Sequence, residues 1–350
     1  SQVTVHRVLL HEGRDVSPAT AERIRAVATE LGYHPETNQF ARKMRSRRHQ
    51  RPVLNHAVAL LNQQGGEVGL YFMLRHFGIT EVLNSTGFDL VLNWAQPTTP
   101  WQLPHTLLRG DIDGVLFSAD ERLIPEVLQQ LRALSGFGDR PVVVYQMVVP
   151  GCSTVCADDF TGGYLLADHL LKLGHRRMLY FIVDSQPQSL RSAGYRNACQ
   201  AHDVDPDEVL VSAQFSYLPW RSHSIAHHVA LREAFTRHPD ITAILAMNDA
   251  SVPYIWTWLD EQGLRVPDDI SLTGFDDVKR VIDERYESLL TTVHVPLHEI
   301  GRQAATLLVD LITGKVTEET HLTLPVNLVI RQSTAPPRTP PLLHRPRGDS

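Results

Sequence analysis

Apolar positions near the start of the chain recur at helical spacing. Val5, Val8 and Leu9 lie at i, i+3 and i+4, which is one face of a helix. A second helix is expected over residues 18–31, and its apolar stripe consists of Ile24, Val27, Ala28 and Leu31. Neither helix can bury its apolar face alone. We therefore expect the two to pack together with a third helix, which the chain lacks and which we place upstream of Ser1.

The ends of the second helix are marked by its flanking residues. Ser17 suits the N-cap and Pro18 the first helical position. Gly32 suits the position after the last turn, and Pro35 prevents the helix from continuing. The chain is therefore expected to begin with two short amphipathic helices.

From about Pro52 the pattern changes to short apolar segments that alternate with amphipathic helices. Seven strands are predicted, at residues 56–62, 88–95, 112–119, 140–148, 175–183, 241–247 and 270–276. Helices are predicted within residues 124–134, 162–174, 193–203 and 229–239. Near-continuous apolar strands are typical of parallel sheets covered on both faces. The number of such units favours an α/β fold with two lobes, whose ligands bind at the carboxyl ends of the strands.

Composition places the chain among ordinary globular proteins. It has 350 residues, 43% of them hydrophobic and 21% charged. No apolar run approaches the ~20 residues that span a bilayer, and no signal peptide is visible. Cys152, Cys156 and Cys199 are too few for a disulfide framework and favour free thiols in a reducing cytoplasm. We therefore expect a cytoplasmic protein.

Motifs for metals and cofactors are weak. His223 and His227 have i, i+4 spacing, with His228 beside them, but no carboxylate lies at a matching position. The cysteines also lack a second pair at zinc spacing. We expect no metal and no cofactor.

Charge is distributed unevenly along the chain, with basic residues concentrated in its first segment. Of the 33 Lys+Arg and 39 Asp+Glu, residues 1–51 hold ten and five, which leaves 23 and 34 for the rest. The first segment therefore carries +5 and the remainder −11, within a net charge of −6. Residues 42–51 alone hold six basic and no acidic residues. A basic head on an acidic body favours contact of the head with phosphate, the alternative being a solvated linker.

A series of motifs, in a fixed order, then carries a resemblance to a known family. The motifs are SQVTVHRVL, VSPATAERIRAVATELGYHP, FARKM, DDFTGGYLLADHLLKLGHRRM, SLRSAGYRNA, AMNDA, VPDDISLTGFDD, LTTVHVPLHEIGRQAATLL and LVIRQST. Together they resemble the LacI/GalR transcriptional regulators from residue 1 to about residue 334. Each motif alone would be weak, whereas their common order and spacing are specific.

The resemblance implies an architecture. A partial helix-turn-helix head and a hinge helix would occupy residues 1–51, with Ser1 at the start of the recognition helix and the family's first helix absent. Two Rossmann-like lobes of periplasmic-binding-protein type would follow over residues 52–335. Lobe 1 would comprise about 53–156 and 292–323, and lobe 2 about 157–291 and 324–335, joined by crossovers near Ala157, Thr291 and Thr323. Residues 336–350 are rich in proline and are expected to be a disordered tail.

The same resemblance assigns residues to DNA contact. In a helix-turn-helix the first residues of the second helix reach base edges in the major groove, and here these are Gln2, Val3 and Arg7. Thr4 and His6 are better placed for phosphate contact or helix packing. The alternative for Gln2 and Arg7 is a solvated face.

The motif FARKM resembles the hinge helix that enters the minor groove. Met44 stands where the family places a leucine wedge, which unstacks a base step and kinks the duplex. Ala41 would allow close helix contact, and Arg42 would lie near the DNA backbone. Six positions separate Pro35 from Ala41, where the family has four, so either the hinge helix starts earlier or the loop is longer. The alternative for Met44 is packing within the protein.

The effector is expected between the lobes. Arg191 matches the family's ligand-binding arginine, whose planar fork donates two hydrogen bonds to a polyol or an anion. Asp276 matches a carboxylate that accepts bonds from ligand hydroxyls, and Asn248 matches an amide that both donates and accepts. The neighbouring Asp249 and Asp277 are interpreted as helix caps.

Three further residues are candidates for the same site. Gln146 stands where many sugar-responsive members carry an acid, which weakens the case for one particular sugar. Trp220 would stack on the apolar face of a sugar or a base, or else serve in the core or a loop. Asn62 follows the first strand and should face the effector.

The sequence thus predicts a DNA-binding transcriptional regulator, a repressor controlled by a small polar effector such as a sugar or sugar derivative. By family analogy it would be a homodimer on a pseudo-palindromic double-stranded operator. A sugar-binding receptor or transport protein with the same two lobes is the alternative, and the basic head argues against it. An enzyme is disfavoured, because the chain has no GxxxxGK[ST], GxSxG or HExxH motif.

Overall fold

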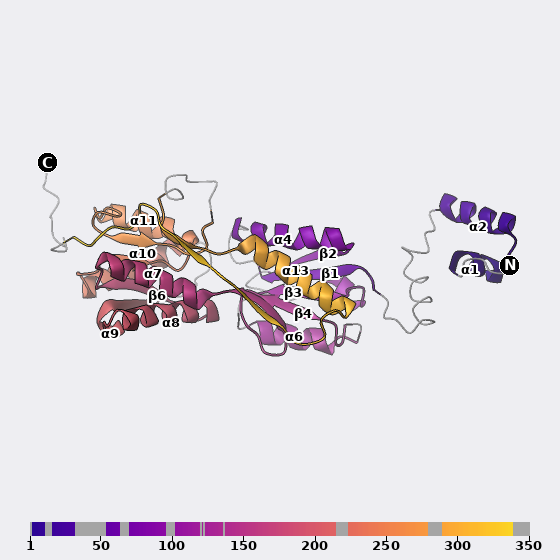
Figure 1. Cartoon of the computed structure of the whole chain (residues 1–350), viewed down its shortest axis with the longest axis horizontal. Coiled ribbons are helices and arrows are strands. Elements are labelled where there is room, and N and C mark those ends of the chain that lie inside the picture. Colours follow the sequence, from indigo (N-terminus) through magenta and orange to yellow (C-terminus); the bar gives the residue numbers. More distant parts are fainter. Residues whose placement is uncertain are drawn as a thin grey trace. The chain divides into compact units, whose positions relative to one another are not determined.

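The structure is a computed structural model. It describes residues 2–10, 16–31, 54–63, 70–95, 102–119, 121, 123–135, 137–214, 223–278 and 289–338. The chain forms two compact units, Ser1–Ala57 and Val58–Ser350, which are considered separately here (Figure 1).

The first unit, called the head below, contains the two predicted helices. These are α1 (Gln2–Leu10) and α2 (Pro18–Glu30), and they pack against each other. Ser17 is the N-cap of α2 with extended backbone, and Pro18 is in the first turn, as predicted. The Ser17 hydroxyl lies 2.8 Å from the Thr20 hydroxyl rather than capping a backbone N–H.

The predicted apolar stripe of α2 is only partly correct. Ala28 is buried, and so is Ala21, which the stripe did not include. Val27 and Leu31 are 46% and 77% exposed. The contact between two helices is a narrow strip, so the described residues of α1 cover the alanine side of α2 and leave its larger apolar side chains outside.

The second unit contains two sheets, and the part built on the first of them is lobe 1. Its strands, in the order β11-β5-β4-β3-β1-β2, are His321–Leu324, Ser153–Ala157, Val142–Tyr145, Gly114–Ser118, Ala57–Gln63 and Asp89–Ala95. The pairs β1–β3, β3–β4, β4–β5 and β5–β11 are all parallel. Every residue of β3 and β4 is buried, as expected for strands covered on both faces.

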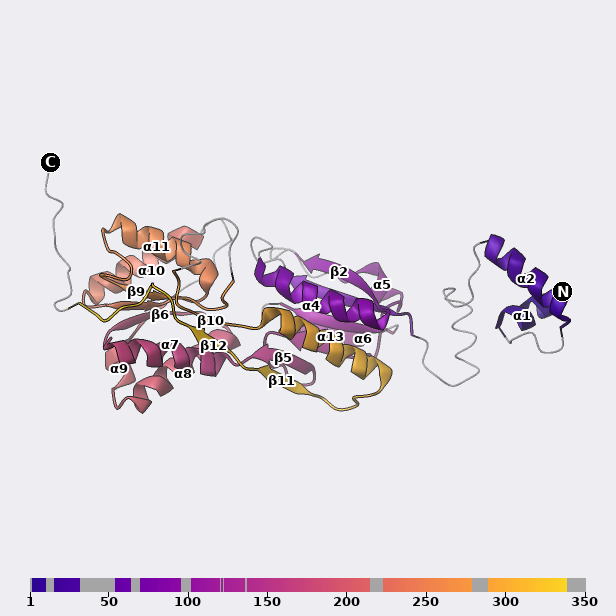
Figure 2. The ribbon, with the colours of Figure 1, turned by 45° about the horizontal axis from the view of Figure 1, so that its top comes forward.

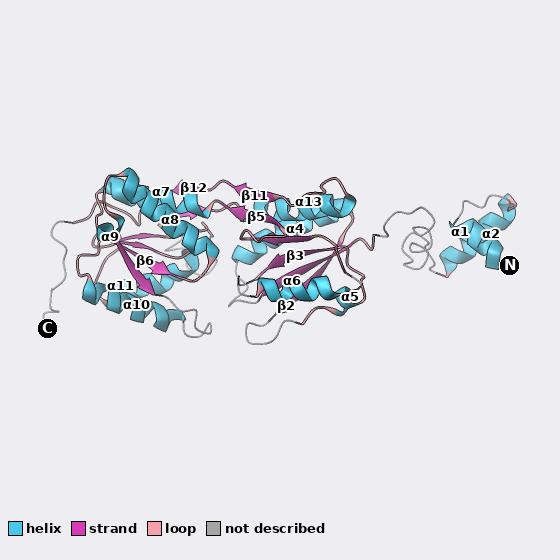
Figure 3. Cartoon of the chain, turned by 90° about the horizontal axis from the view of Figure 1, so that it is seen from below, coloured by secondary structure: helices cyan, strands magenta, loops and turns pink. Residues whose placement is uncertain are grey.

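Helices cover both faces of the lobe 1 sheet (Figure 3). On one face α4 (Leu70–Thr86) packs against α13 (Leu297–Thr313), and on the other lie α5 (His105–Leu108) and α6 (Ile124–Ala133). Two glycines allow α4 and α13 to approach closely. A Cβ atom at Gly78 would lie 2.1 Å from the His298 carbonyl oxygen, and one at Gly301 would lie 2.0 Å from the Arg75 carbonyl oxygen.

The part built on the second sheet is lobe 2. Its parallel strands, in the order β7-β6-β8-β9, are Leu210–Gln214, Met178–Ile182, Ala243–Leu245 and Ser271–Thr273. Its helices are α7 (Asp159–Leu173), α8 (Gln186–Ala201), α9 (Pro206–Val209), α10 (His223–Arg237), the short η2 (Asp249–Ser251) and α11 (Val252–Glu261). Glycines again set the spacing, since a Cβ at Gly163 would lie 2.2 Å from the Arg191 carbonyl oxygen.

The chain crosses between the lobes at three places in the described residues. It leaves β5 at Ala157 for α7, leaves β10 (Thr292–His294) for α13, and leaves β11 for β12 (Asn327–Val329). The strands β10 and β12 form an antiparallel pair of their own (Figure 2). The two-lobed α/β fold and all seven predicted strands are confirmed. The short strands β5, β7, β10, β11 and β12 were not predicted as strands.

The C-terminal segment stays attached to lobe 2 further than its composition indicates. Ala335 N donates to Ser271 Oγ at 3.0 Å, and Arg338 pairs with Asp269 at 3.0 Å. The predicted tail from Pro336 is therefore ordered through Arg338, and residues 339–350 lie outside the described residues.

Candidate functional site

In the head, α1 is the candidate DNA-reading helix. Val8 is buried against α2, and Arg7 beside it is exposed, which is the arrangement that a groove-facing arginine needs. Thr4 is half-buried and takes part in a contact. Gln2, Val3 and His6 lie on the helical backbone, but their side chains lie outside the described part, as do the hinge residues Ala41, Arg42 and Met44 entirely.

Lobe 1 brings polar side chains together at the carboxyl ends of three neighbouring strands. Asn62 is at the end of β1, Ser118 ends β3, and Gln146 follows β4. The Gln146 side-chain oxygen accepts a hydrogen bond from Ser118 Oγ at 2.7 Å. The buried Asn62 accepts from the Tyr145 hydroxyl at 2.8 Å, and its Nδ2 lies 2.8 Å from His76 Nε2. Asn62 is therefore already bonded within lobe 1.

Arg75, on α4, is the most unusual side chain of this lobe. It is 1% exposed, and its guanidinium carbon lies 4.2, 5.0 and 5.1 Å from the ring centroids of Tyr71, Phe72 and Tyr145. One nitrogen, Nη1, donates to Gln146 Oε1 at 3.2 Å. Nε and Nη2 are buried and make no hydrogen bond within the described part of the chain. The cation is therefore held by aromatic faces and one amide.

Lobe 2 contributes a buried arginine that is paired with a carboxylate and a backbone carbonyl. Arg191, on α8, donates from Nε to Asp159 Oδ1 at 2.7 Å and from Nη1 to the Met247 carbonyl oxygen at 2.6 Å. Its guanidinium lies 3.5 Å from the centroid of the Phe275 ring. Burial raises the pKa of Asp159, although Arg191 opposes this shift. The predicted effector residue Arg191 thus also has a structural role.

Asp276 follows β9 in a strained backbone conformation. Its φ of 107° lies in the region that favours glycine, and so does the φ of 123° at Gln146 in lobe 1. The Asp276 side chain is 8% exposed, and burial raises its pKa well above the ordinary value. No hydrogen bond or ion pair to its carboxylate occurs among the described residues. Strained residues at strand ends are typical of binding sites, where the surrounding structure enforces them.

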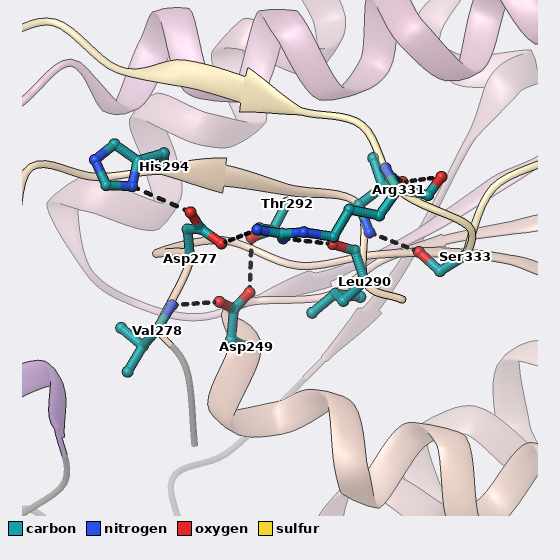
Figure 4. A network of polar contacts seen from close by, with 9 residues as sticks. Asp249, Asp277, Val278, Leu290, Thr292, His294, Arg331 and Ser333 are labelled. Atoms are coloured by element: carbon teal, nitrogen blue, oxygen red, sulfur yellow. Dashed lines mark hydrogen bonds and ion pairs between the residues drawn. The ribbon is translucent and has the colours of Figure 1, made fainter. Parts of the chain in front are cut away.

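A polar network holds the turn that presents Asp276 (Figure 4). Asp277 accepts from Arg331 Nη2 at 2.7 Å and lies 3.2 Å from His294 Nδ1. Asp249 accepts from the Thr292 hydroxyl at 2.7 Å and from Val278 N at 2.9 Å. The network joins lobe 2 to β10 and to the segment after β12, which are the crossover segments. Burial raises the pKa of Asp249 to about 7.

The interpretation of Asp249 as a helix cap is wrong, whereas that of Asp277 stays a prediction, since residues 279–288 after it lie outside the described residues. The cap of η2 is Asn248, whose Oδ1 accepts from Ser251 N at 3.0 Å in a capping box. Both aspartates bond to residues of the crossover segments that are distant in sequence. The sequence lacked this information, because an acid beside a helix start matches a cap equally well.

The candidate residues of the two lobes lie within reach of one another's charge. Tyr71 of lobe 1 has its pKa raised to about 12 by burial, and Asp276 of lobe 2 adds to this shift. Arg75 in turn lowers the pKa of Asp276, against the effect of burial. The lobes also meet directly, since Gln186 exchanges hydrogen bonds with Val148 at 2.7 and 3.1 Å.

We call this set the inter-lobe site, and it consists of Asn62, Tyr71, Arg75, Gln146, Asp159, Arg191 and Asp276. Trp220, which was also predicted to contact the effector, lies outside the described residues.

Comparisons with known proteins agree with the two-lobed fold. The family of the periplasmic binding protein-like domain matches residues 167–334. The HTH-type transcriptional regulator CelR of Thermobifida fusca is 33% identical over 340 residues, which cover 94% of this chain and 94% of CelR. The chain belongs to the LacI/GalR family of transcriptional regulators.

Other LacI/GalR regulators match over similar lengths. The HTH-type transcriptional regulator DegA of Bacillus subtilis is 28% identical over 354 residues, with 97% of this chain and 96% of DegA covered. Among solved structures, the transcriptional regulator CelR–cellobiose complex has a TM-score of 0.63 and 27% identity, covering 95% of this chain and 96% of that one. A LacI family regulator from Enterococcus faecium with bound ribose has a TM-score of 0.62 and 26% identity, covering 81% and 100%.

Three residues of the inter-lobe site of this LacI/GalR regulator were missed at the sequence level. They are Tyr71, Arg75 and Asp159. A signal existed for the first two, since an aromatic residue and an arginine at i, i+4 share one helix face. For Asp159 the signal was its place in the first turn of a helix, where an acid is usual for other reasons.

Other candidate chemistry found no support in the described part of the molecule. The three cysteines are buried and unpaired, as predicted, and burial raises the pKa of each thiol, that of Cys199 to about 11. The described residues hold no group of three His, Cys, Asp or Glu suited to a metal. Among them there is also no helix long and apolar enough to cross a membrane.

Proposed function

We propose that this regulator is a repressor whose operator affinity is controlled by a small polar effector bound at the inter-lobe site. The observation that supports this most is the meeting of buried hydrogen-bonding groups from both lobes. Asp276 follows the carboxyl end of a lobe 2 strand and Gln146 that of a lobe 1 strand, where α/β folds bind ligands, and Arg191 lies on α8, the helix after β6.

The chemistry of these groups fits a carbohydrate. Asp276 accepts hydrogen bonds, Arg191 donates them, and Gln146 does both, which suits a ligand whose hydroxyls donate and accept. Relatives captured with cellobiose and with ribose show that the same fold takes such ligands. The receptor alternative is weaker, because the relatives that match along nearly the whole chain, head included, are named as transcriptional regulators.

Control of DNA binding follows from the two-lobed design. An effector that contacts both lobes binds one lobe arrangement more tightly than another. It alters operator affinity only through this difference in its own affinity for the two arrangements. A coupling of about 1–3 kcal/mol, or roughly 5–150-fold, is usual. On the DNA side, Gln2, Val3 and Arg7 would read bases, Thr4 and His6 would contact phosphate or pack, and Ala41, Arg42 and Met44 would form the hinge contact. A regulator of this kind acts in the cytoplasm.

A homodimer is part of the proposal. On lobe 1, Met73 and Phe77 lie one helical turn apart on α4 and are 42% and 52% exposed. Leu92 on the edge strand β2 is 48% exposed. Large apolar side chains exposed on an edge strand and its covering helix favour burial against another copy.

The test combines an operator titration with a sugar screen. Sugars that raise the thermal stability of the full chain are added to operator DNA, and the change in affinity is measured by fluorescence anisotropy. Asp276→Asn should weaken effector binding at least tenfold and leave affinity for free operator within about threefold, because Asn is nearly isosteric. Arg191→Ala is less informative, since it also leaves Asp159 buried without a partner. Operator affinity unaffected by every stabilising sugar would contradict the proposal.

A further inference from the structure

Arg75 is a buried cation without a counter-ion. Among the described residues no carboxylate lies within ion-pair distance of it. Within the described residues the Arg75 side chain donates one hydrogen bond, from Nη1 to the neutral amide of Gln146 at 3.2 Å, and Nε and Nη2 make none. The three aromatic rings around it attract the cation but accept few hydrogen bonds. A guanidinium carries five N–H donors, so most of its hydrogen-bonding capacity is unused.

Arg191 of lobe 2 lies in a similar environment but has partners that Arg75 lacks in the described part of the chain. Each arginine lies where a glycine of the neighbouring helix contacts its backbone, Gly301 for Arg75 and Gly163 for Arg191. Each also lies over aromatic rings. Arg191 has a carboxylate and a backbone carbonyl as partners, whereas Arg75 has only the side-chain amide oxygen of Gln146 among the described residues. A buried charge is tolerated when it is paired, so a partner supplied from outside the protein would complete the environment of Arg75.

The opposite lobe contributes a buried carboxyl group that, within the part of the chain that the structure describes, lacks a hydrogen-bond donor and does not provide a counter-ion for Arg75. Asp276 carries a buried carboxyl with no side-chain partner among the described residues, so it requires a donor. Burial raises the pKa of Asp276, and no ion pair joins it to Arg75 among the described residues. A ligand between them would present hydroxyl groups to Asp276 and an anionic acceptor to Arg75.

We propose that the effector is an acidic carbohydrate, and that Arg75 binds its anionic oxygen group while Asp276 and Arg191 bind its hydroxyls. The fork of an arginine matches carboxylate and phosphate oxygens alike, with two parallel hydrogen bonds. The shared chemistry is therefore a carboxylate or phosphate on a sugar. This inference rests on the proposed function, because it concerns the ligand of the same site.

The experiment compares sugars that differ only in the acidic group. Calorimetric titrations of the full chain use glucose, glucuronate and glucose 6-phosphate, and then cellobiose and cellobiouronate. An acidic member is expected to bind at least tenfold more tightly than its neutral parent. If the carboxylate sugar binds more tightly than its neutral parent, the anionic group is a carboxylate. If the phosphate sugar does, it is a phosphate.

Two variants test the residue itself. Arg75→Met keeps a long apolar side chain among the rings and removes the charge, so it should weaken acid binding at least tenfold and change neutral-sugar binding less than threefold. The melting temperature without ligand should not fall, because an unpaired buried charge is removed. Arg196→Met, at an exposed ion pair on α8, is the control and should leave binding and the acid preference unchanged.

Neutral sugars that bind as tightly as their acids would overturn the inference, and so would Arg75→Met weakening both equally while lowering the melting temperature. If neutral sugars bind and shift operator affinity, the proposed function stands and only this inference fails. If acids bind through Arg75 without changing operator affinity, the inference stands and the proposed function fails. Absence of binding by every one of these sugars would overturn the inference as well.

Discussion

The buried ion pair between Asp159 and Arg191 gives a sharp test of how lobe 2 is stabilised. Asp159→Ala removes a carboxylate whose oxygen lies 2.7 Å from Arg191 Nε, in side chains that are 5% and 9% exposed. Arg191 would keep its bond to the Met247 carbonyl and its stacking on Phe275, but it would lose its counter-ion. Removing one partner of a buried pair costs about 3–5 kcal/mol. We expect the free energy of unfolding to fall by that amount.

The reciprocal change should be similarly destabilising, and the double variant should not. Arg191→Met keeps an apolar side chain over Phe275 but leaves the Asp159 carboxylate without its partner. In the double variant no charge remains buried. Burial raises the pKa of Asp159, and Arg191, which opposes this shift, is absent from the double variant together with the carboxylate. Replacing a buried pair by apolar groups is often neutral, so the double variant should lie within about 2 kcal/mol of the wild type.

Urea unfolding followed by circular dichroism measures all four proteins under one buffer condition. The four proteins form a double-mutant cycle, and a coupling energy above about 2 kcal/mol between Asp159 and Arg191 would show that the two side chains stabilise lobe 2 jointly. Arg196→Met, which breaks an exposed pair with Asp207, is the matched control and should change stability by less than about 1 kcal/mol. A double variant that loses the sum of the two single losses would refute the reasoning.

Three further predictions concern packing, pH and assembly. Gly301→Ala places a methyl group about 2.0 Å from a backbone oxygen of α4 and should destabilise lobe 1 by about 1–3 kcal/mol in urea unfolding, whereas Gln303→Ala on the same helix should not. Asp249 has its pKa raised to about 7 in the folded state. The unfolded chain therefore releases this proton at lower pH, and the free energy of unfolding should fall as the pH rises from about 4 to about 7. That slope, worth up to about 4 kcal/mol, should be absent from Asp249→Asn and should therefore remain in the difference between the wild type and this variant, and an unchanged slope in Asp249→Asn would contradict the assignment. Phe77→Arg should convert the proposed dimer to a monomer in sedimentation velocity, while Leu108→Arg, at a similarly exposed position of α5, should not.

The sequence by itself determined the fold class and most of the strands. Strands such as β3 and β4 are buried at every position, so their residues form continuous apolar runs that are visible without a structure. Strands β7 and β11 could not be recognised in this way. They contain exposed polar residues, for example Ser212 and His321, and they are strands because a neighbouring strand pairs with them.

The residues of the inter-lobe site likewise differ in whether the sequence alone could indicate them. Arg191 and Asp276 could be assigned from motifs, because motifs preserve local spacing. The importance of Arg75 could not, since an arginine on a helix is ordinarily exposed and only the packing of α4 against α13 and the sheet buries it. Asp249 likewise looked like a local cap, while its partner Thr292 lies 43 residues away. Local pattern specifies which segments form elements, but burial and pairing depend on neighbours that only the folded chain brings together.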